Sequence, residues 1–314
     1  MIFWTPSPYL TTQLDQVQQL MISAIRVKNP QTQQAILDLL TSGGKMLRPA
    51  YLLLFAEFTR LERNKKIALA SSIELLHTAT LIHDDIIDKA ETRRGVPTIS
   101  HLYGTDVAVY AGDYLFVTVF KIMAQHALDL SNLSNRIDAM EKLLDGELGQ
   151  MNLRFNTDQT IHDYIDNISG KTAELFAQAC AVAPFADKQD RLAQLAYEIG
   201  LNVGIAFQIM DDFLDYTADR HTFGKPVLAD IQQGIYSAPV LFALAADPQV
   251  AALLKTKAFD DVFKAIHQSG ALEKTHQLAQ TYTLKALKLI DKLPTHPIKS
   301  DIYQMTEKLL ERHL

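Results

Sequence analysis

The sequence predicts an all-α fold: a single domain of ten or more helices that spans residues 1–314. Apolar residues recur at spacings of three and four along most of the chain, which is the period of a helix with one buried face. Glycine and proline gather between these segments, as at Gly43–Gly44 and at Gly95 with Pro97. Alternating runs bounded by hairpin turns, which would indicate strands, are nearly absent.

The helices are expected in a definite order along the chain. The segment 67–88 is long, apolar and free of glycine and proline. Further helices are predicted at 105–127, 133–153, 172–186, 190–216 and 236–246, with three more between residues 258 and 313.

Composition excludes several classes of protein. The chain is 48% hydrophobic and carries a net charge of −6, whereas a general nucleic-acid binder is usually basic. Its one cysteine, Cys180, cannot form an internal disulfide, which is typical of a reducing compartment. The N-terminal residues lack the pattern of a signal peptide, and Asp113 interrupts the most apolar stretch, VAVYAGDYLFVTVF. We therefore expect a cytoplasmic protein with no membrane span.

The pattern D-D-x-x-D occurs twice, each time at the C-terminal end of a long apolar helix. Residues three and four apart share a helix face, so the carboxylates of each copy repel one another where the helix dipole also disfavours negative charge. A hard cation would stabilise such a cluster, and Mg²⁺ bridging phosphate oxygens is the usual case. One copy alone could be a solvated helix end; two copies favour a pair of metal sites. The aspartates are Asp84, Asp85 and Asp88, then Asp211, Asp212 and Asp215.

Basic residues beside these motifs, or at expected helix starts after glycine, supply the charge that an anionic ligand requires. Each alone is more often a surface charge, and their shared placement favours binding. They are Lys45, Arg48, Arg93, Arg94, Lys171 and Lys225. His77 lies two turns before Asp84 and is either a core histidine or a phosphate-facing group that Glu74 could orient.

The ordered motifs GGKxxRP, ELLHxATLxHDDxxD, RRGxPT, GDYLF, GELxQ, GKTAELF, FQxxDDxLD and GKPxxxD resemble those of the trans-isoprenyl diphosphate synthases. They cover the chain from about residue 40 to residue 246. The resemblance implies an isoprenoid-synthase bundle of helices around a central cavity, homodimeric in most members. It also implies the condensation of an allylic diphosphate with isopentenyl diphosphate, with three Mg²⁺ ions per active site.

The resemblance also implies roles for single residues. The six aspartates would hold the metals, and Arg93, Lys171 and Lys225 would contact the allylic diphosphate. Thr172 and Gln208 would lie near the allylic carbocation. The site for isopentenyl diphosphate would consist of Lys45, Arg48, His77 and Arg94. In one departure, Ile235 follows Gly234 where many relatives have lysine, which puts the strength of diphosphate binding on that side in doubt.

Three other functions share part of this pattern. A class I terpene cyclase has D-D-x-x-D but needs no second diphosphate site, and the GGKxxRP and RRG segments argue against it. A non-catalytic subunit of a heteromeric synthase would lose the second acidic motif or the arginine pair, and this chain keeps both. An all-α metal-binding interaction module would show no metal-dependent turnover. A small partner subunit remains possible for an active enzyme.

Product length is predicted from the residues below the first acidic motif. Helical geometry favours Thr80 as the residue that faces a growing chain, and the resemblance favours Ala79. The next bulky residue on that stripe is Leu76. These small groups predict an open channel and a hexaprenyl to octaprenyl product, or geranylgeranyl diphosphate if another helix closes the channel.

Overall fold

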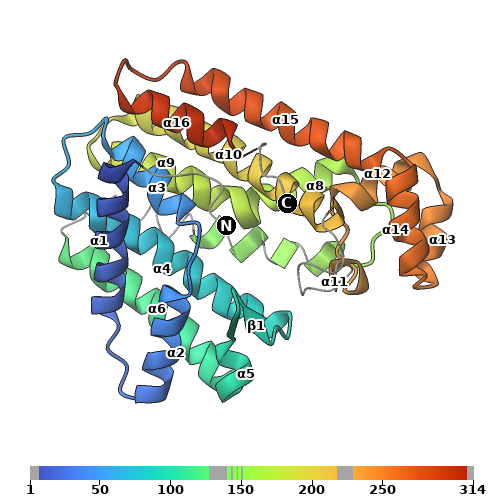
Figure 1. Cartoon of the computed structure of the whole chain (residues 1–314), viewed down its shortest axis with the longest axis horizontal. Coiled ribbons are helices and arrows are strands. Elements are labelled where there is room, and N and C mark those ends of the chain that lie inside the picture. The colour runs from blue at the N-terminus through green and yellow to red at the C-terminus, as the bar shows by residue number, and fades with distance from the viewer. Residues whose placement is uncertain are drawn as a thin grey trace. The chain divides into compact units, whose positions relative to one another are not determined.

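A computed structural model describes residues 7–126, 140–142, 144–146, 148–149, 151–217 and 229–309. Within these ranges the chain forms fifteen α-helices, one π-helical turn and one hairpin of two-residue strands (Figure 1). The all-α prediction is therefore confirmed.

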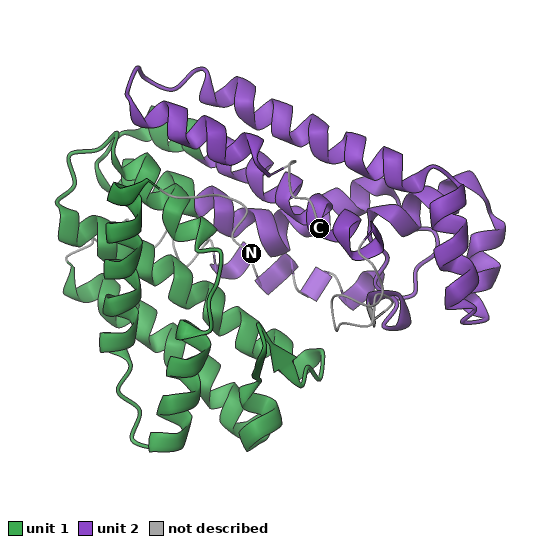
Figure 2. Ribbon diagram, in the orientation of Figure 1, with its two compact units in different colours: residues 1–136, 179–196 green, residues 137–178, 197–314 purple. Residues whose placement is uncertain are grey.

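The chain divides into two compact units (Figure 2). Unit 1 consists of residues 1–136 and 179–196, and unit 2 of residues 137–178 and 197–314. The expectation of a single domain over the whole chain stays a prediction.

Six helices of unit 1 precede and follow its hairpin. They are α1 (Pro8–Ala24), α2 (Pro30–Thr41), α3 (Leu47–Ala56), α4 (Arg63–Ile87), α5 (Ile99–Tyr103) and α6 (Thr105–Gln125), with β1 (Thr92–Arg93) and β2 (Val96–Pro97) between α4 and α5. Side chains of Ser7 and Asn29 cap the first two helices by accepting backbone N–H groups, and Pro8 and Pro30 occupy their first positions. Every residue of α3 except Arg48 is buried, and α4 packs against α1, α3 and α6.

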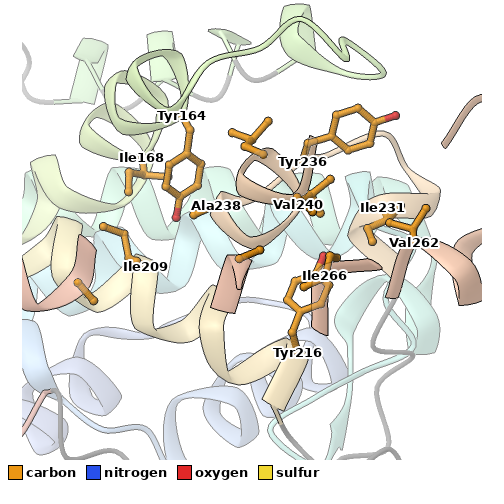
Figure 3. Packing of buried hydrophobic residues seen from close by; sticks show 14 of the residues in the cluster. Tyr164, Ile168, Ile209, Tyr216, Ile231, Tyr236, Ala238, Val240, Val262 and Ile266 are labelled. Carbon is orange, nitrogen blue, oxygen red and sulfur yellow. The ribbon is translucent and has the colours of Figure 1, made fainter. Parts of the chain in front are cut away.

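Unit 2 contains the second acidic motif, Asp211–Asp215, on α10 (Asp190–Thr217). Its elements are α8 (Ile161–Ile168), the π-turn η1 (Ser169–Ala173), α11 (Ala229–Gln232), α12 (Ala238–Ala246), α13 (Gln249–Lys255), α14 (Phe259–Gln268), α15 (Ala271–Ile290) and α16 (Ile298–Glu307). It also holds the start of α9 (Glu174–Ala186) and most of α10 (Asp190–Thr217). Buried side chains such as Tyr164, Ile209, Tyr216, Val240 and Ile266 join α8, α10, α12 and α14 in one core (Figure 3).

The predicted helices match the observed ones closely where the structure describes them. The segment 67–88 lies in α4, and the predictions at 105–127, 190–216 and 236–246 correspond to α6, α10 and α12. The predicted helix 172–186 is η1 followed by α9. Much of the helix predicted at 133–153 lies outside the described residues. The three helices predicted between residues 258 and 313 are α14, α15 and α16. The helices α1, α2, α5, α8, α11 and α13 were not predicted.

Asp113 does not interrupt α6, which continues through it for 21 residues. By length and composition α6 is the one helix among the described residues that could cross a membrane. However, 44% of its apolar window is buried, and buried core helices pass the same test. This single helix is therefore weak evidence for a membrane protein, and the expectation of no membrane span stays a prediction.

Candidate active site

The first acidic motif ends α4 in unit 1, and its three carboxylates differ in exposure. Asp85 is 3% exposed, and its Oδ1 accepts a hydrogen bond from Arg93 Nε at 2.6 Å. Asp84 is half-buried and Asp88 is exposed. The middle carboxylate therefore holds the hairpin that follows α4, and the outer two are more accessible.

The hairpin turn directs the two neighbouring arginines to different partners. Arg94 and Gly95 both have positive φ, as a two-residue hairpin turn of type I′ requires. Arg93 contacts Asp85, whereas the Arg94 guanidinium packs against Gly44, where an added Cβ would lie 2.8 Å from Nη1. The structure thus brings the Gly43–Gly44 turn and Arg94 together within unit 1, as the predicted isopentenyl diphosphate site requires.

Glu74 and His77 lie in the electrostatic field of these arginines. Burial and the guanidinium groups of Arg48, Arg94 and Arg93 lower the pKa of His77 well below its usual value of 6.5. Burial raises the pKa of Glu74, and Arg48 and Arg94 oppose that rise. His77 is therefore neutral near pH 7, where it can donate a hydrogen bond without carrying charge. Glu74, Thr78 and Arg94 also line a cavity of about 210 Å³ beside Gly43 and Gly44.

The lowered pKa of His77 predicts how the unfolding free energy of the metal-free protein depends on pH. Between the folded pKa and 6.5, the unfolded state binds more protons, so stability rises with pH through that window and is lost as pH falls. Urea unfolding should therefore show that the stability difference between wild type and His77→Gln grows up to about pH 6.5 and is constant above it.

Glu74→Gln provides a control of opposite sign. Because the pKa of Glu74 is raised above 4.5, its contribution to stability is lost as pH rises above that value. A stability difference for His77→Gln that does not change with pH would show that His77 titrates normally in the folded protein.

The second acidic motif, on α10 in unit 2, has the same gradation of exposure. Asp212 is 9% exposed, whereas Asp211 is half-buried and Asp215 is exposed. Asp212 Oδ2 accepts a hydrogen bond from Tyr164 Oη at 2.6 Å, and its Oδ1 accepts one from Gln208 Nε2 at 2.8 Å. In both motifs the middle carboxylate is buried and bonded to protein donors.

Burial raises the pKa of Asp212 to about 8, its two hydrogen bonds oppose that rise, and the carboxylates of Asp215 and Asp230 add to it. Burial, with the nearby charge of Asp212, raises the pKa of Tyr164 well above its usual value. The tyrosine therefore keeps its proton and acts as the donor to Asp212.

The π-turn η1 carries Lys171 and Thr172. Such turns occur often at functional sites because the extra residue re-aims side chains. Here two glycines allow close backbone contact: an added Cβ on Gly146 would lie 2.6 Å from Lys171 N, and one on Gly170 would lie 3.0 Å from Gly146 Cα. Thr172, 8% exposed, donates to Gln208 Oε1 at 2.8 Å. The structure thus brings together Thr172, Gln208 and Asp212.

The acidic motifs fit magnesium by their chemistry. Among the described residues, no group of three or more His, Cys, Asp or Glu side chains forms a metal-binding cluster by itself. However, a Mg²⁺ ion that binds a diphosphate usually keeps waters and takes only one or two carboxylates from the protein. Each motif offers two hard oxygen ligands of this kind on its accessible side: Asp84 and Asp88, and Asp211 and Asp215.

The remaining predicted residues lie in several places. Lys45 lies two residues before α3, and Arg48 is the second residue of α3. Leu76, Ala79 and Thr80 lie on α4. Lys225 lies outside the described residues. Ile235 follows Gly234, which has a φ of +77° and accepts a hydrogen bond from Phe155 N at 2.8 Å.

Sequence reasoning missed Tyr164. Its signal is weak: a tyrosine two helical turns before Lys171, in a segment whose start shows only Thr160 with Asp163 three residues later.

A family model gives the site its context. The model described as Polyprenyl synthetase matches residues 29–269. The chain belongs to the polyprenyl synthetase family. This membership confirms the resemblance to the trans-isoprenyl diphosphate synthases and makes the protein a prenyl transferase.

Relatives of the polyprenyl synthetase support the same assignment over nearly the whole chain. A prenyl transferase of Cyanidium caldarium is 34% identical and covers 95% of this chain and 94% of its own. Heptaprenyl diphosphate synthase component 2 of Geobacillus stearothermophilus is 35% identical, with 91% of each chain covered. The crystal structure of a geranylgeranyl pyrophosphate synthase from Lactobacillus brevis ATCC 367 has a TM-score of 0.93 at 39% identity, with 97% of this chain and 98% of that chain covered.

Proposed function

We propose that this prenyl transferase condenses an allylic diphosphate with isopentenyl diphosphate in a Mg²⁺-dependent reaction. The observation that carries the proposal is the graded burial of both D-D-x-x-D motifs. In each, the middle carboxylate is buried against a protein donor, and the outer carboxylates are more accessible. The family resemblance implies that both motifs hold metal ions on the allylic diphosphate.

Asp84, Asp88, Asp211 and Asp215 would hold the metal ions, three per active site by the family resemblance. When bound, Mg²⁺ neutralises the charge that develops on the leaving diphosphate. Asp85 and Asp212, which the resemblance also implies as ligands, accept hydrogen bonds from Arg93 and from Tyr164 and Gln208.

Cationic side chains bind and orient the allylic diphosphate. Arg93, Lys171 and Lys225 have this role by resemblance. The ion pair with Asp85 limits the rotamers of Arg93, and the close contact between Gly146 and the η1 backbone limits movement of Lys171. Such preorganisation lowers the cost of stabilising charge as the C–O bond ionises.

The second substrate is assigned to the arginine-rich region of unit 1. Arg48 and Arg94, with Lys45, would neutralise the diphosphate of isopentenyl diphosphate, and the neutral His77 would donate a hydrogen bond to it. Binding presents the double bond to the allylic cation and so supplies proximity. The new C–C bond leaves a cation that loses a proton to the departing diphosphate, so no side-chain base is needed.

Replacing Arg48 by Ala is expected to raise the KM for isopentenyl diphosphate by about tenfold or more, and the KM for the allylic primer by much less. The physical reason is the loss of a charge-assisted contact to only one substrate. Initial rates with each substrate varied in turn provide the measurement. Equal effects on both KM values would show that the two sites are assigned wrongly.

An assay of the purified protein tests the function directly. With radiolabelled isopentenyl diphosphate, an allylic primer and MgCl₂, we expect longer prenyl diphosphates, and none in excess EDTA. Cyclic hydrocarbon formed from the allylic substrate alone would instead indicate a terpene cyclase. No turnover by a folded protein until another subunit is added would indicate a component of a heteromeric synthase.

We further propose a homodimer that makes a hexaprenyl to octaprenyl product in the cytoplasm. Exposed apolar side chains on α6, Val109, Tyr110 and Val117, support self-association. The similarity to a heptaprenyl synthase component supports the product range and leaves room for a small partner subunit, while the similarity to a geranylgeranyl synthase supports the shorter alternative. Sedimentation equilibrium of the purified chain tests the dimer.

A further inference from the structure

A chain of hydrogen bonds in unit 2 links a buried tyrosine to Thr172. Tyr164 Oη donates to Asp212 Oδ2 at 2.6 Å, and Gln208 Nε2 donates to Asp212 Oδ1 at 2.8 Å. Thr172 Oγ1 then donates to Gln208 Oε1 at 2.8 Å. Asp212 is thus the common acceptor, held from both sides.

The direction of each bond follows from the orientation of the Gln208 amide. Its NH₂ group faces Asp212 Oδ1, so its carbonyl oxygen faces Thr172 and can only accept. The Thr172 hydroxyl therefore donates its single proton to Gln208 Oε1. Its oxygen lone pairs remain available, which is the polarity that favours a nearby positive charge.

Tyr164 is the most firmly held member of this chain. The ring is 4% exposed in the unit 2 core and lies beside Ile168, with its hydroxyl pointing away from α8 (Figure 3). A capping box between Thr160 and Asp163 fixes the start of α8 at Ile161, three residues before Tyr164. Without the hydroxyl, Asp212 Oδ2 loses its donor, and a buried carboxylate with an unsatisfied oxygen is free to reorient.

We propose that Tyr164 is a positioning residue for the prenyl transfer reaction, which acts through Asp212 and Gln208 to present Thr172 as a hydrogen-bond acceptor toward the developing carbocation. This inference rests on the proposed function. It assigns Tyr164 no contact with substrate or metal.

The first test separates kcat from KM. Tyr164→Phe keeps the ring in the core and removes only the donor. We expect kcat to fall by about 10- to 100-fold, the effect of leaving one buried acceptor without its donor, with the KM for each diphosphate within about threefold of wild type. A kcat within about twofold of wild type in a folded variant would overturn the proposal.

Tyr197→Phe is the matched control. The hydroxyl of Tyr197 also donates to a buried carboxylate of unit 2, that of Glu174, which is 4% exposed. This substitution should leave kcat within about twofold of wild type. An equal fall in kcat for both variants would show a general loss of core packing and would overturn the proposal.

The second test does not depend on activity. In metal-free protein, Tyr164→Phe should lower Tm by roughly 3–8 °C, and by less than about 1 °C in an Asp212→Leu background, because the partner is already absent. Tyr197→Phe should lower Tm equally in both backgrounds. If the Tm shifts of Tyr164→Phe and Asp212→Leu were additive, the hydrogen-bond chain would be overturned. If wild type failed to condense the two diphosphates, the proposed function would be wrong. The double-mutant cycle of Tyr164→Phe and Asp212→Leu would still test the chain of hydrogen bonds.

Discussion

Asp84→Ala and Asp211→Ala are each expected to lower turnover by about 1000-fold or more while leaving the fold intact. Both are the first residue of a D-D-x-x-D motif, and both are half-buried rather than enclosed. The family resemblance implies that both motifs hold metals on the allylic diphosphate, so removing either carboxylate should affect the same ionisation step. Steady-state turnover at saturating substrates and Mg²⁺, with circular dichroism to verify folding, provides the measurement.

The chain offers a matched control for this pair of variants. Asp260 and Asp261 also stand side by side, in the first turn of α14, but Lys264 rather than an aspartate follows, and its Nζ lies 2.8 Å from Asp261 Oδ1. Asp261→Ala removes a carboxylate that pairs with Lys264 and belongs to neither D-D-x-x-D motif, so turnover should be unchanged. Near-normal turnover in a folded Asp84→Ala or Asp211→Ala protein would contradict the shared-metal model.

Sequence reasoning predicted the features that depend on local pattern. The period of apolar residues indicates which face of α4 or α10 is buried, and the breakers at Gly43–Gly44 and Gly95 fall between helices. The same logic identified both acidic motifs, because charge at a helix C-terminus is visible in sequence. The contact between Arg94 and Gly44 was expected only through the family resemblance.

The features that sequence reasoning missed depend on tertiary partners. Both middle aspartates look identical to their neighbours in sequence, and only the position of Arg93 or Tyr164 makes Asp85 and Asp212 buried acceptors. The π-turn at Lys171 lies against Gly146, which contacts Gly170 from 24 positions away in the sequence. A periodicity argument that runs along one segment cannot detect such contacts.

Thr80→Phe is expected to shorten the main product, from a hexaprenyl to octaprenyl range toward farnesyl or geranylgeranyl diphosphate. Thr80 lies one turn below Asp84 on α4, about 6 Å along the helix axis, and is partly exposed, so a ring there projects outward instead of into the core. Ala79 is 0% exposed and Leu76 6%, so Ala79→Phe must overpack unit 1 at a cost of about 1–3 kcal/mol.

The two aromatic variants together locate the face of α4 that the growing chain follows. If the chain passes Thr80, Thr80→Phe blocks it with little loss of stability, because a ring cannot be compressed by a flexible prenyl chain. If it passes Ala79, as the family resemblance implies, Ala79→Phe shortens the product and lowers Tm together. Chromatography of the dephosphorylated products, with Thr80→Ser as the control of unchanged length, decides between them. Farnesyl diphosphate as the sole product of the unmodified enzyme would contradict the open channel, because the small side chains at positions 79 and 80 would then leave unused space beneath the metal site.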